Sequence, residues 1–197
     1  IDSGELEVLA REAVAQANAY YLLLHGVEDA EEPTVLPFDL AEGSRILEGG
    51  WAVLVEEMGL PEIVGSRYGP VKATGVTRVL EAFDISGVFS PFTGEALING
   101  GPPAVSLPAV MAHEQAHQRG FAPEDEASFM GIMASIRSED PMVRYSGWAR
   151  VVRRFAGDLQ RADREARTSV VEDLLPGVRR DWQDWADYWA ANRSRAA

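Results

Sequence analysis

The run HEQAH at residues 113–117 lies in a segment that would be apolar on nearly every side if it were helical. Polar residues inside such an apolar segment constrain the fold more than any other feature of the sequence. Ser106 is expected to cap a helix here, with Pro108 in its first turn and Gly120 just beyond its end. The sequence therefore predicts a helix over residues 107–119. A helix that lacks a polar face is buried, so we expect this one in the core. Its apolar residues are Leu107, Ala109, Val110, Met111, Ala112 and Ala116.

His113 and His117 are four residues apart and therefore share one face of this helix. That spacing lets two imidazoles bind one metal ion, and Glu114 projects beside the same site as a general base. The alternative is a solvated helix face with two unrelated histidines, which burial disfavours because buried imidazoles need partners. The chain has no cysteine, so the ligands must be nitrogen and oxygen, and we expect one Zn²⁺ ion.

A catalytic zinc ion usually has three protein ligands, so one more ligand is needed. The next predicted helix begins with Glu124, Asp125 and Glu126. Glu126 shares a helical stripe with Phe129, Met130 and Met133, which we interpret as the inward face, and the pattern favours Glu126 as the third ligand. Glu124 and Asp125 are interpreted as ordinary negative charge at a helix N-terminus.

Hydrolysis of an acyl bond also needs a donor for the oxyanion, commonly a Tyr, His or Arg side chain. Tyr145 is the candidate, with Arg144 beside it. The alternative places the tyrosine in the core and the arginine at the surface. Residues 95–99 could form an edge strand that binds an extended peptide, or a plain hairpin.

The rest of the chain predicts an α+β fold that is predominantly helical, in one domain over residues 1–197. Its parts are N-terminal helices in 1–60, a small β region in 62–105, metal-site helices in 106–138 and C-terminal helices in 140–197. The expected helices span 4–24, 40–58, 107–119, 123–137, 141–157, 160–174 and 178–192. The expected strands span 87–92 and 95–99.

Charge excludes one class of partner. The chain has 31 acidic and 18 basic residues, a formal net charge of −13, so a surface that neutralises nucleic-acid phosphates is not expected. No apolar run approaches the roughly 20 residues of a spanning helix. The sequence begins with Ile1, from which we expect a preceding segment, such as a membrane anchor, to be missing.

Three runs together resemble a known bacterial family: PFTGEA at 91–96, LPAVMAHEQAHQRGFAPEDEASF at 107–129 and RYSGW at 144–148. The family consists of membrane-anchored proteins regarded as zinc peptidases, carries a domain of unknown function and is related to the gluzincins. The resemblance is strongest over residues 70–150. It implies a zincin-like metallopeptidase domain outside the cytoplasm, attached to the membrane through a segment absent here, with Glu126 of EDEASF as third ligand. Leu97 departs from the asparagine common after PFTGEA.

The leading hypothesis is therefore a zinc metallopeptidase that cleaves peptide bonds with zinc-activated water and Glu114 as general base and then acid. One alternative is a zinc-binding sensor or scaffold domain of a membrane protein with little turnover, although the carboxylate of Glu114 would then have no use. Another is an amidase of the cell envelope, which would share every ligand. Substrate identity and oligomeric state stay open.

Overall fold

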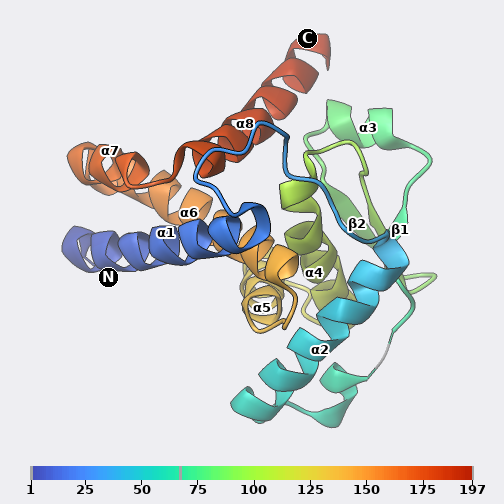
Figure 1. The fold of residues 1–197 in the computed structure, drawn as a ribbon. Coiled ribbons are helices and arrows are strands. Elements are labelled where there is room, and N and C mark those ends of the chain that lie inside the picture. Colours follow the sequence, from blue (N-terminus) through green and yellow to red (C-terminus); the bar gives the residue numbers. More distant parts are fainter. Residues whose placement is uncertain (1, 67, 197) are drawn as a thin grey trace.

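The computed structural model describes residues 2–66 and 68–196 and shows a predominantly helical chain with one small mixed sheet (Figure 1). This confirms the α+β class. The helices are α1 (Ser3–His25), α2 (Leu40–Met58), α3 (Thr77–Ala82), α4 (Leu107–Gln118), α5 (Glu124–Ile136), α6 (Pro141–Ala162), α7 (Arg164–Glu172) and α8 (Pro176–Ala196), with 3₁₀ turns at Glu62–Gly65 and Ala104–Ser106. The strands are β1 (Lys72–Ala73), β2 (Gly87–Ser90) and β3 (Glu95–Ile98).

The strand order is β1-β3-β2, so β3 lies in the centre of the sheet. It pairs parallel with β1 and antiparallel with β2, with Val88 opposite Leu97. The expectation that residues 95–99 form an edge strand is therefore wrong, because that segment has a neighbour on both sides. The two edges of the sheet are formed by β1 and β2. The pattern analysis missed β1 and α3, which are only two and six residues long.

Helix boundaries follow their capping residues. Asp2 caps α1 in a reciprocal capping box with Glu5. Asp163 ends α6 in an extended conformation and its side chain caps α7, so α6 runs five residues beyond the expected end at 157. Ser106 does not cap α4 with its side chain, because its hydroxyl donates to the carbonyl of Pro103 in the preceding turn.

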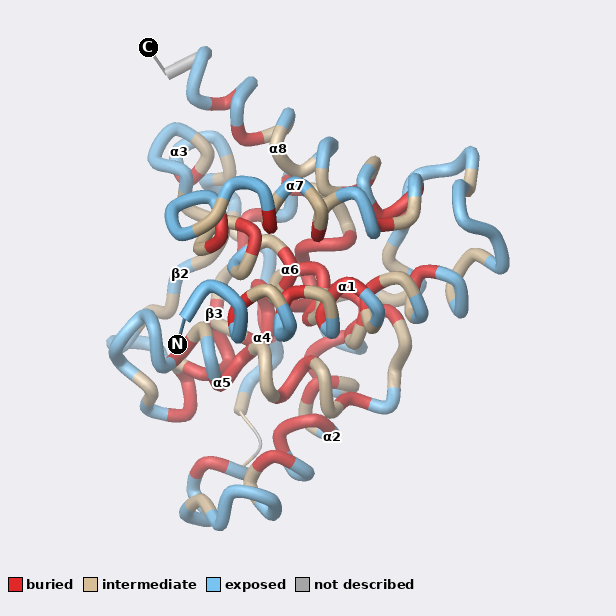
Figure 2. Tube along the Cα trace, turned by 90° about the vertical axis from the view of Figure 1, so that its left-hand side faces the viewer, coloured by how far each residue is buried: buried red, intermediate tan, exposed pale blue. Residues whose placement is uncertain are grey.

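Two clusters of buried apolar residues form the core. One joins α1, α6, α7 and α8, and the other joins α2, the sheet, α4 and α5. Figure 2 shows buried segments running through α4 and α6 in the middle of the molecule. Ten of the twelve residues of α4 are buried, which confirms the burial expected from its composition.

Polar contacts fix α4 to the helices on either side. The indole Nε1 of Trp51 on α2 donates to Oε1 of Gln115 at 3.0 Å, and Nε2 of Gln115 donates to the carbonyl of Ser44 at 3.2 Å. On α6, the hydroxyl of Ser146 accepts from the backbone N–H of Ala109 at 3.0 Å. This last bond satisfies an N–H of the first turn, which has no partner inside the helix. The contacts therefore hold the HEQAH turns in a defined position.

Helices α4 and α5 approach closely at Gly131. A Cβ atom at this residue would lie 2.8 Å from the backbone nitrogen of His113, a distance that real Cβ contacts do not reach. Ala127 and Ala134, which lie on the same side of α5, are also fully buried. Small residues therefore let α5 pack directly against the backbone of the HEQAH turn.

Replacing Gly131 by alanine is expected to destabilise the fold by about 2 kcal/mol, because the obstacle is backbone that cannot swing aside. Gly157→Ala on α6 is the matched control, since nothing lies within 4 Å of its added Cβ. That control should be neutral or stabilising by up to about 1 kcal/mol from helix propensity. Urea denaturation of both variants measures the difference, and equal stability would contradict the close packing.

No helix among the described residues is long and apolar enough to span a membrane.

Candidate metal centre

The structure brings His113, His117 and Glu124 together at one point on α4 and the start of α5. Oε2 of Glu124 lies 3.1 Å from Nε2 of His113, and its Oε1 lies 3.5 Å from Nε2 of His117. The two imidazole centroids are 4.8 Å apart. Tetrahedral ligands about 2.1 Å from a zinc ion lie roughly 3.4 Å from one another. The two separations between Glu124 and the histidines are therefore close to those of ligands that share a metal ion.

The other nitrogen of each imidazole has its own partner. Nδ1 of His117 lies 2.8 Å from the carbonyl of Phe121, which can only accept, so this nitrogen carries the proton. When only this nitrogen carries a proton, the lone pair is on Nε2, facing the carboxylate of Glu124. Nδ1 of His113 lies 3.3 Å from the hydroxyl of Ser128, which can either donate or accept. Nε2 of His117 and the carboxylate of Glu124 then face each other as two acceptors that a shared cation would satisfy, and metal-bound histidines are typically held through their other nitrogen by such partners.

The protonation of His113 also suits a ligand. Burial lowers the pKa of His113 to about 4, and the nearby Arg150 and His117 also lower it. The carboxylate of Glu124 acts in the opposite direction. The imidazole is therefore neutral at neutral pH, which is the form that binds metal ions.

Glu114 lies beside this cluster with a buried carboxyl group. The residue is 3% exposed, and its Oε2 has no hydrogen-bond partner among the described residues. Burial raises its pKa to about 8, with a further increase from Glu124 and an opposing effect from Arg150. Gly87 of β2 covers it so closely that a Cβ there would lie 2.4 Å from Oε1 of Glu114. An unsatisfied buried oxygen is costly and indicates a missing partner, such as a water or an ion.

The carboxylate beside the histidines belongs to Glu124, whereas Glu126 is exposed and not part of the cluster. The expected inward stripe through Phe129 is wrong, because Phe129 is 51% exposed. Helix α5 instead packs through Ala127 and its other small residues, and Glu124 lies one turn before Ala127 on that side. The difference from the expected ligand Glu126 therefore lies in which side of α5 faces α4.

Tyr145 lies in the core and its hydroxyl is already engaged. It donates to Oδ2 of Asp181 at 2.6 Å, and burial together with Asp181 raises the tyrosine pKa well above its usual value. Arg144 bonds the carbonyl of Ser138 and the hydroxyl of Tyr20, the latter at 2.6 Å. Neither expected oxyanion donor has been brought to the histidine cluster.

The open edge of β2 passes next to the cluster. Asn99 N–H donates to the carbonyl of Ser86, and in this register Val88 and Ser90 also turn their backbone groups toward β3. The N–H and C=O groups of Gly87 and Phe89 therefore face the open edge. The same two residues contact the site, since Gly87 lies against Glu114 and the ring of Phe89 stacks on His117 with centroids 6.4 Å apart.

Arg150 on α6 is a charged residue near the cluster that the sequence analysis missed. Its charge acts to lower the pKa of both His113 and Glu114, while burial lowers the pKa of Arg150 itself against the opposing charges of Glu114 and Glu124. Position 150 carries no local motif, so only the packing of α6 on α4 reveals it.

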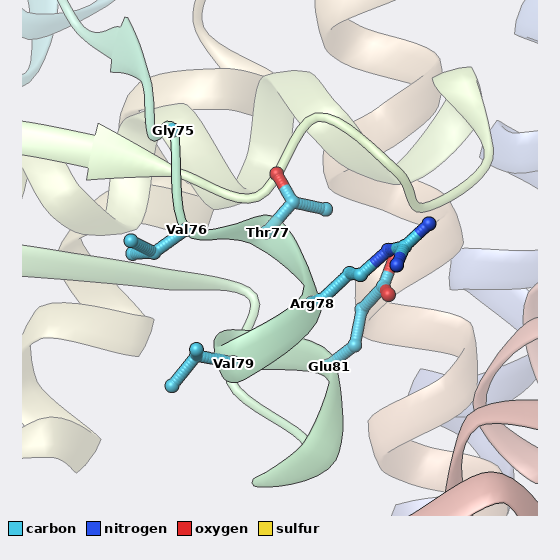
Figure 3. A pocket seen from close by; sticks show the side chains of 6 residues that line it. All are labelled: Gly75, Val76, Thr77, Arg78, Val79 and Glu81. Carbon is cyan, nitrogen blue, oxygen red and sulfur yellow. The ribbon is translucent and has the colours of Figure 1, made fainter.

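A hollow of about 570 Å³ lies elsewhere, along α3 and the residues just before it (Figure 3). Val76 and Val79 point to one side, whereas Arg78 and Glu81 point to the other. No residue of the histidine cluster lines it. Its side chains do not converge on a common point, so it has no evident part in the chemistry of the cluster.

Residues 3–197 match the family model described as "Protein of unknown function (DUF3810)". No curated protein and no solved structure matches the chain.

Proposed function

We propose that this chain, which belongs to the DUF3810 family, is a zinc-dependent hydrolase of peptide bonds. The proposal starts from the cluster of His113, His117 and Glu124. His113, His117 and Glu124 would hold one Zn²⁺ ion. The observation that carries the proposal is that their three ligand atoms lie within 4.8 Å of one another beside the buried carboxyl group of Glu114.

The ligands suit zinc because they offer two imidazole nitrogens and one carboxylate oxygen, as in zinc sites that keep a position open for water. Glu124 belongs to the helix after HEQAH, the arrangement of a gluzincin. When bound, the ion would supply Lewis-acid chemistry that makes a water more acidic and polarises a carbonyl group.

Glu114 would move the protons. Its carboxylate accepts a proton from the attacking water and returns it to the leaving amine as the C–N bond breaks. The position of Glu114 supports this role because its carboxyl group lies beside the cluster and its Oε2, which has no partner among the described residues, is free to receive the proton. A purely structural zinc ion would not need this group.

The open edge of β2 would bind the substrate. An extended peptide could pair with the free backbone groups of Gly87 and Phe89, and the ladder would place its carbonyl groups alongside Glu114 and His117. Because backbone pairing does not depend on side chains, this supports a peptide substrate over a small amide. Cleavage of envelope amides would use the same cluster.

The location of the proposed enzyme follows from the resemblance of its motifs. On that basis the proposal includes attachment to a bacterial membrane through a segment outside this chain, with the domain on the extracytoplasmic side.

A zinc sensor or scaffold is the second candidate, and the exposure of Glu124 favours it. The side chain of Glu124 is 81% exposed, so a metal ion held there could exchange readily with solvent. This function predicts zinc binding without hydrolysis, whereas the leading proposal requires both.

Removal and return of zinc test the leading proposal. The chelated chain is expected to lose hydrolysis of a peptide library and to regain it with one equivalent of Zn²⁺ but not Mg²⁺. At a free zinc concentration 100 times the dissociation constant, the fold should gain about 2.7 kcal/mol, measured as a rise in Tm. Zinc binding without hydrolysis in any library would favour the sensor, and no zinc binding would reject both candidates.

A further inference from the structure

The carboxyl group of Glu114 is closed off by the start of β2. The residue is 3% exposed, and the backbone of Gly87 lies so close that a Cβ there would be 2.8 Å from Cδ of Glu114. On the same strand, the ring of Phe89 stacks on His117, whose side chain is 11% exposed. A carboxyl group that solvent barely reaches cannot act on a water and a substrate carbonyl together. The start of β2 must therefore move before the proposed chemistry can occur.

The two ends of β2 are held in different ways. The strand pairs with β3 on one side and has an open edge on the other. Beyond its last residue, the turn to β3 is closed by the N–H of Gly94, which donates to the carbonyl of Ser90 at 2.8 Å. At its start, the N–H of Asn99 donates to the carbonyl of Ser86, the neighbour of Gly87, at 2.8 Å. A strand pair frays most readily at the end that no turn closes, so Gly87 can move when this end alone opens.

The hydroxyl of Tyr188 on α8 ties that end together. It donates to Oε1 of Glu81 on α3 at 2.6 Å, shortly before β2, and accepts a longer bond of 3.5 Å from Nδ2 of Asn99, directly after β3. Burial and the bond to Glu81 raise the pKa of Tyr188 to about 12, so the hydroxyl keeps its proton at neutral pH. One side chain of α8 therefore joins the segment that enters β2 to the end of β3.

Neighbouring residues fit this clamp. Gly101 leaves room for it, because a Cβ there would lie 2.4 Å from the hydroxyl oxygen of Tyr188 and 2.8 Å from Oε1 of Glu81. The N–H of Gly101 donates to Oδ1 of Asn99 at 3.0 Å, which orients this buried amide with Nδ2 toward Tyr188. Helix α3 has six residues and packs against α8. Because a helix this short has little stability of its own, its position depends on that contact.

We propose that Tyr188 is a positioning residue that clamps the start of β2 over Glu114, so that α8 gates the proposed hydrolytic site. The gating role rests on the proposed function, whereas the clamp does not. Loss of the hydroxyl bonds releases the chain from Glu81 to Gly87 and uncovers the carboxyl group. Strand β3 stays in place, because Ala96 and Ile98 are fully buried and the strand packs on α4.

Chemical labelling of carboxyl groups tests the clamp without relying on turnover. The metal-free chain is treated with a water-soluble carbodiimide and an amine, and mass spectrometry follows the modification of each residue. Glu114 is expected to react about tenfold faster in Tyr188→Phe than in the native chain, because the variant loses a bond to a carboxylate that holds the closed state. Tyr20→Phe is the matched control, since it removes a hydroxyl that bonds Arg144 between α1 and α6, and it should label like the native chain.

Asp181, a buried carboxyl group on the same helix as Tyr188, is the internal reference. Its labelling should not change, and equal acceleration at Asp181 and Glu114 would mean a general loosening and overturn the clamp. Native-like labelling of Glu114 in Tyr188→Phe would overturn it too. With zinc bound, kcat/KM of this variant should rise about tenfold, and an unchanged or lower value would overturn the gating role. Faster labelling of Glu114 without hydrolysis by either chain would reject the hydrolase and keep the clamp.

Discussion

Replacing Glu114 by glutamine is expected to reduce hydrolysis by about 10²–10⁴-fold, the usual contribution of a general base, while zinc stays bound. Glutamine keeps the shape of the side chain but cannot accept the water proton. The residue is not one of the three clustered ligands, so the histidines keep their geometry. The measurement compares initial rates and zinc content of native chain and Glu114→Gln under the same conditions.

Glu126→Gln is the control for this experiment because it removes an acidic group near the site without touching the cluster. It should retain the native rate. Native-like activity of Glu114→Gln would show that another group moves the protons and would remove the reason for a buried carboxyl group at this position. Loss of zinc from Glu114→Gln would instead mean that Glu114 is itself a ligand.

Zinc affinity is expected to fall by more than about 100-fold in Glu124→Gln and to stay native in Glu126→Gln. Loss of a group that only supports a ligand already costs roughly 10–100-fold, so loss of a ligand should cost more. Competition with a chromophoric chelator measures both dissociation constants. The two variants differ by two residues on one helix turn and remove the same charge, so general electrostatics cancels in the comparison.

The reverse result, with zinc lost only in Glu126→Gln, would restore the ligand expected from the sequence. It would require the first turn of α5 to rearrange on metal binding. An equal, small effect in both variants would leave two histidines without a third protein ligand and would weaken the case for a catalytic centre.

The helix that bears the histidines could be predicted because several signals agree on it. Pro108 marks its start, Gly120 follows its end, and its composition requires burial whatever surrounds it. The i, i+4 spacing of His113 and His117 then fixes their common face. None of this depends on knowing how other helices pack.

The third carboxylate could not be chosen in the same way. The large apolar residues predict an inward face of α5 through Phe129, but the small residues Ala127 and Gly131 make the close approach to α4. Gly131 is the signal that was present in the sequence, since a glycine in a helix interior costs stability and often marks a close contact. Such a contact favours Glu124, which lies on the side of Ala127, over Glu126.

Other parts of the site depend on contacts between distant segments. Strand β1 has two residues and exists through its pairing with β3, so no local pattern reveals it. Arg150 lies in the middle of a long helix among other arginines, and only the docking of α6 on α4 distinguishes it. Long-range packing therefore supplies what periodicity cannot.

X-ray absorption at the zinc edge tests the central claim most directly, because it reports the atoms bound to the ion. The zinc-loaded chain is expected to show two imidazole nitrogens, from His113 and His117, and oxygen ligands at about 2.0–2.1 Å. One imidazole or none in the spectrum would contradict a metal centre built on the HEQAH helix.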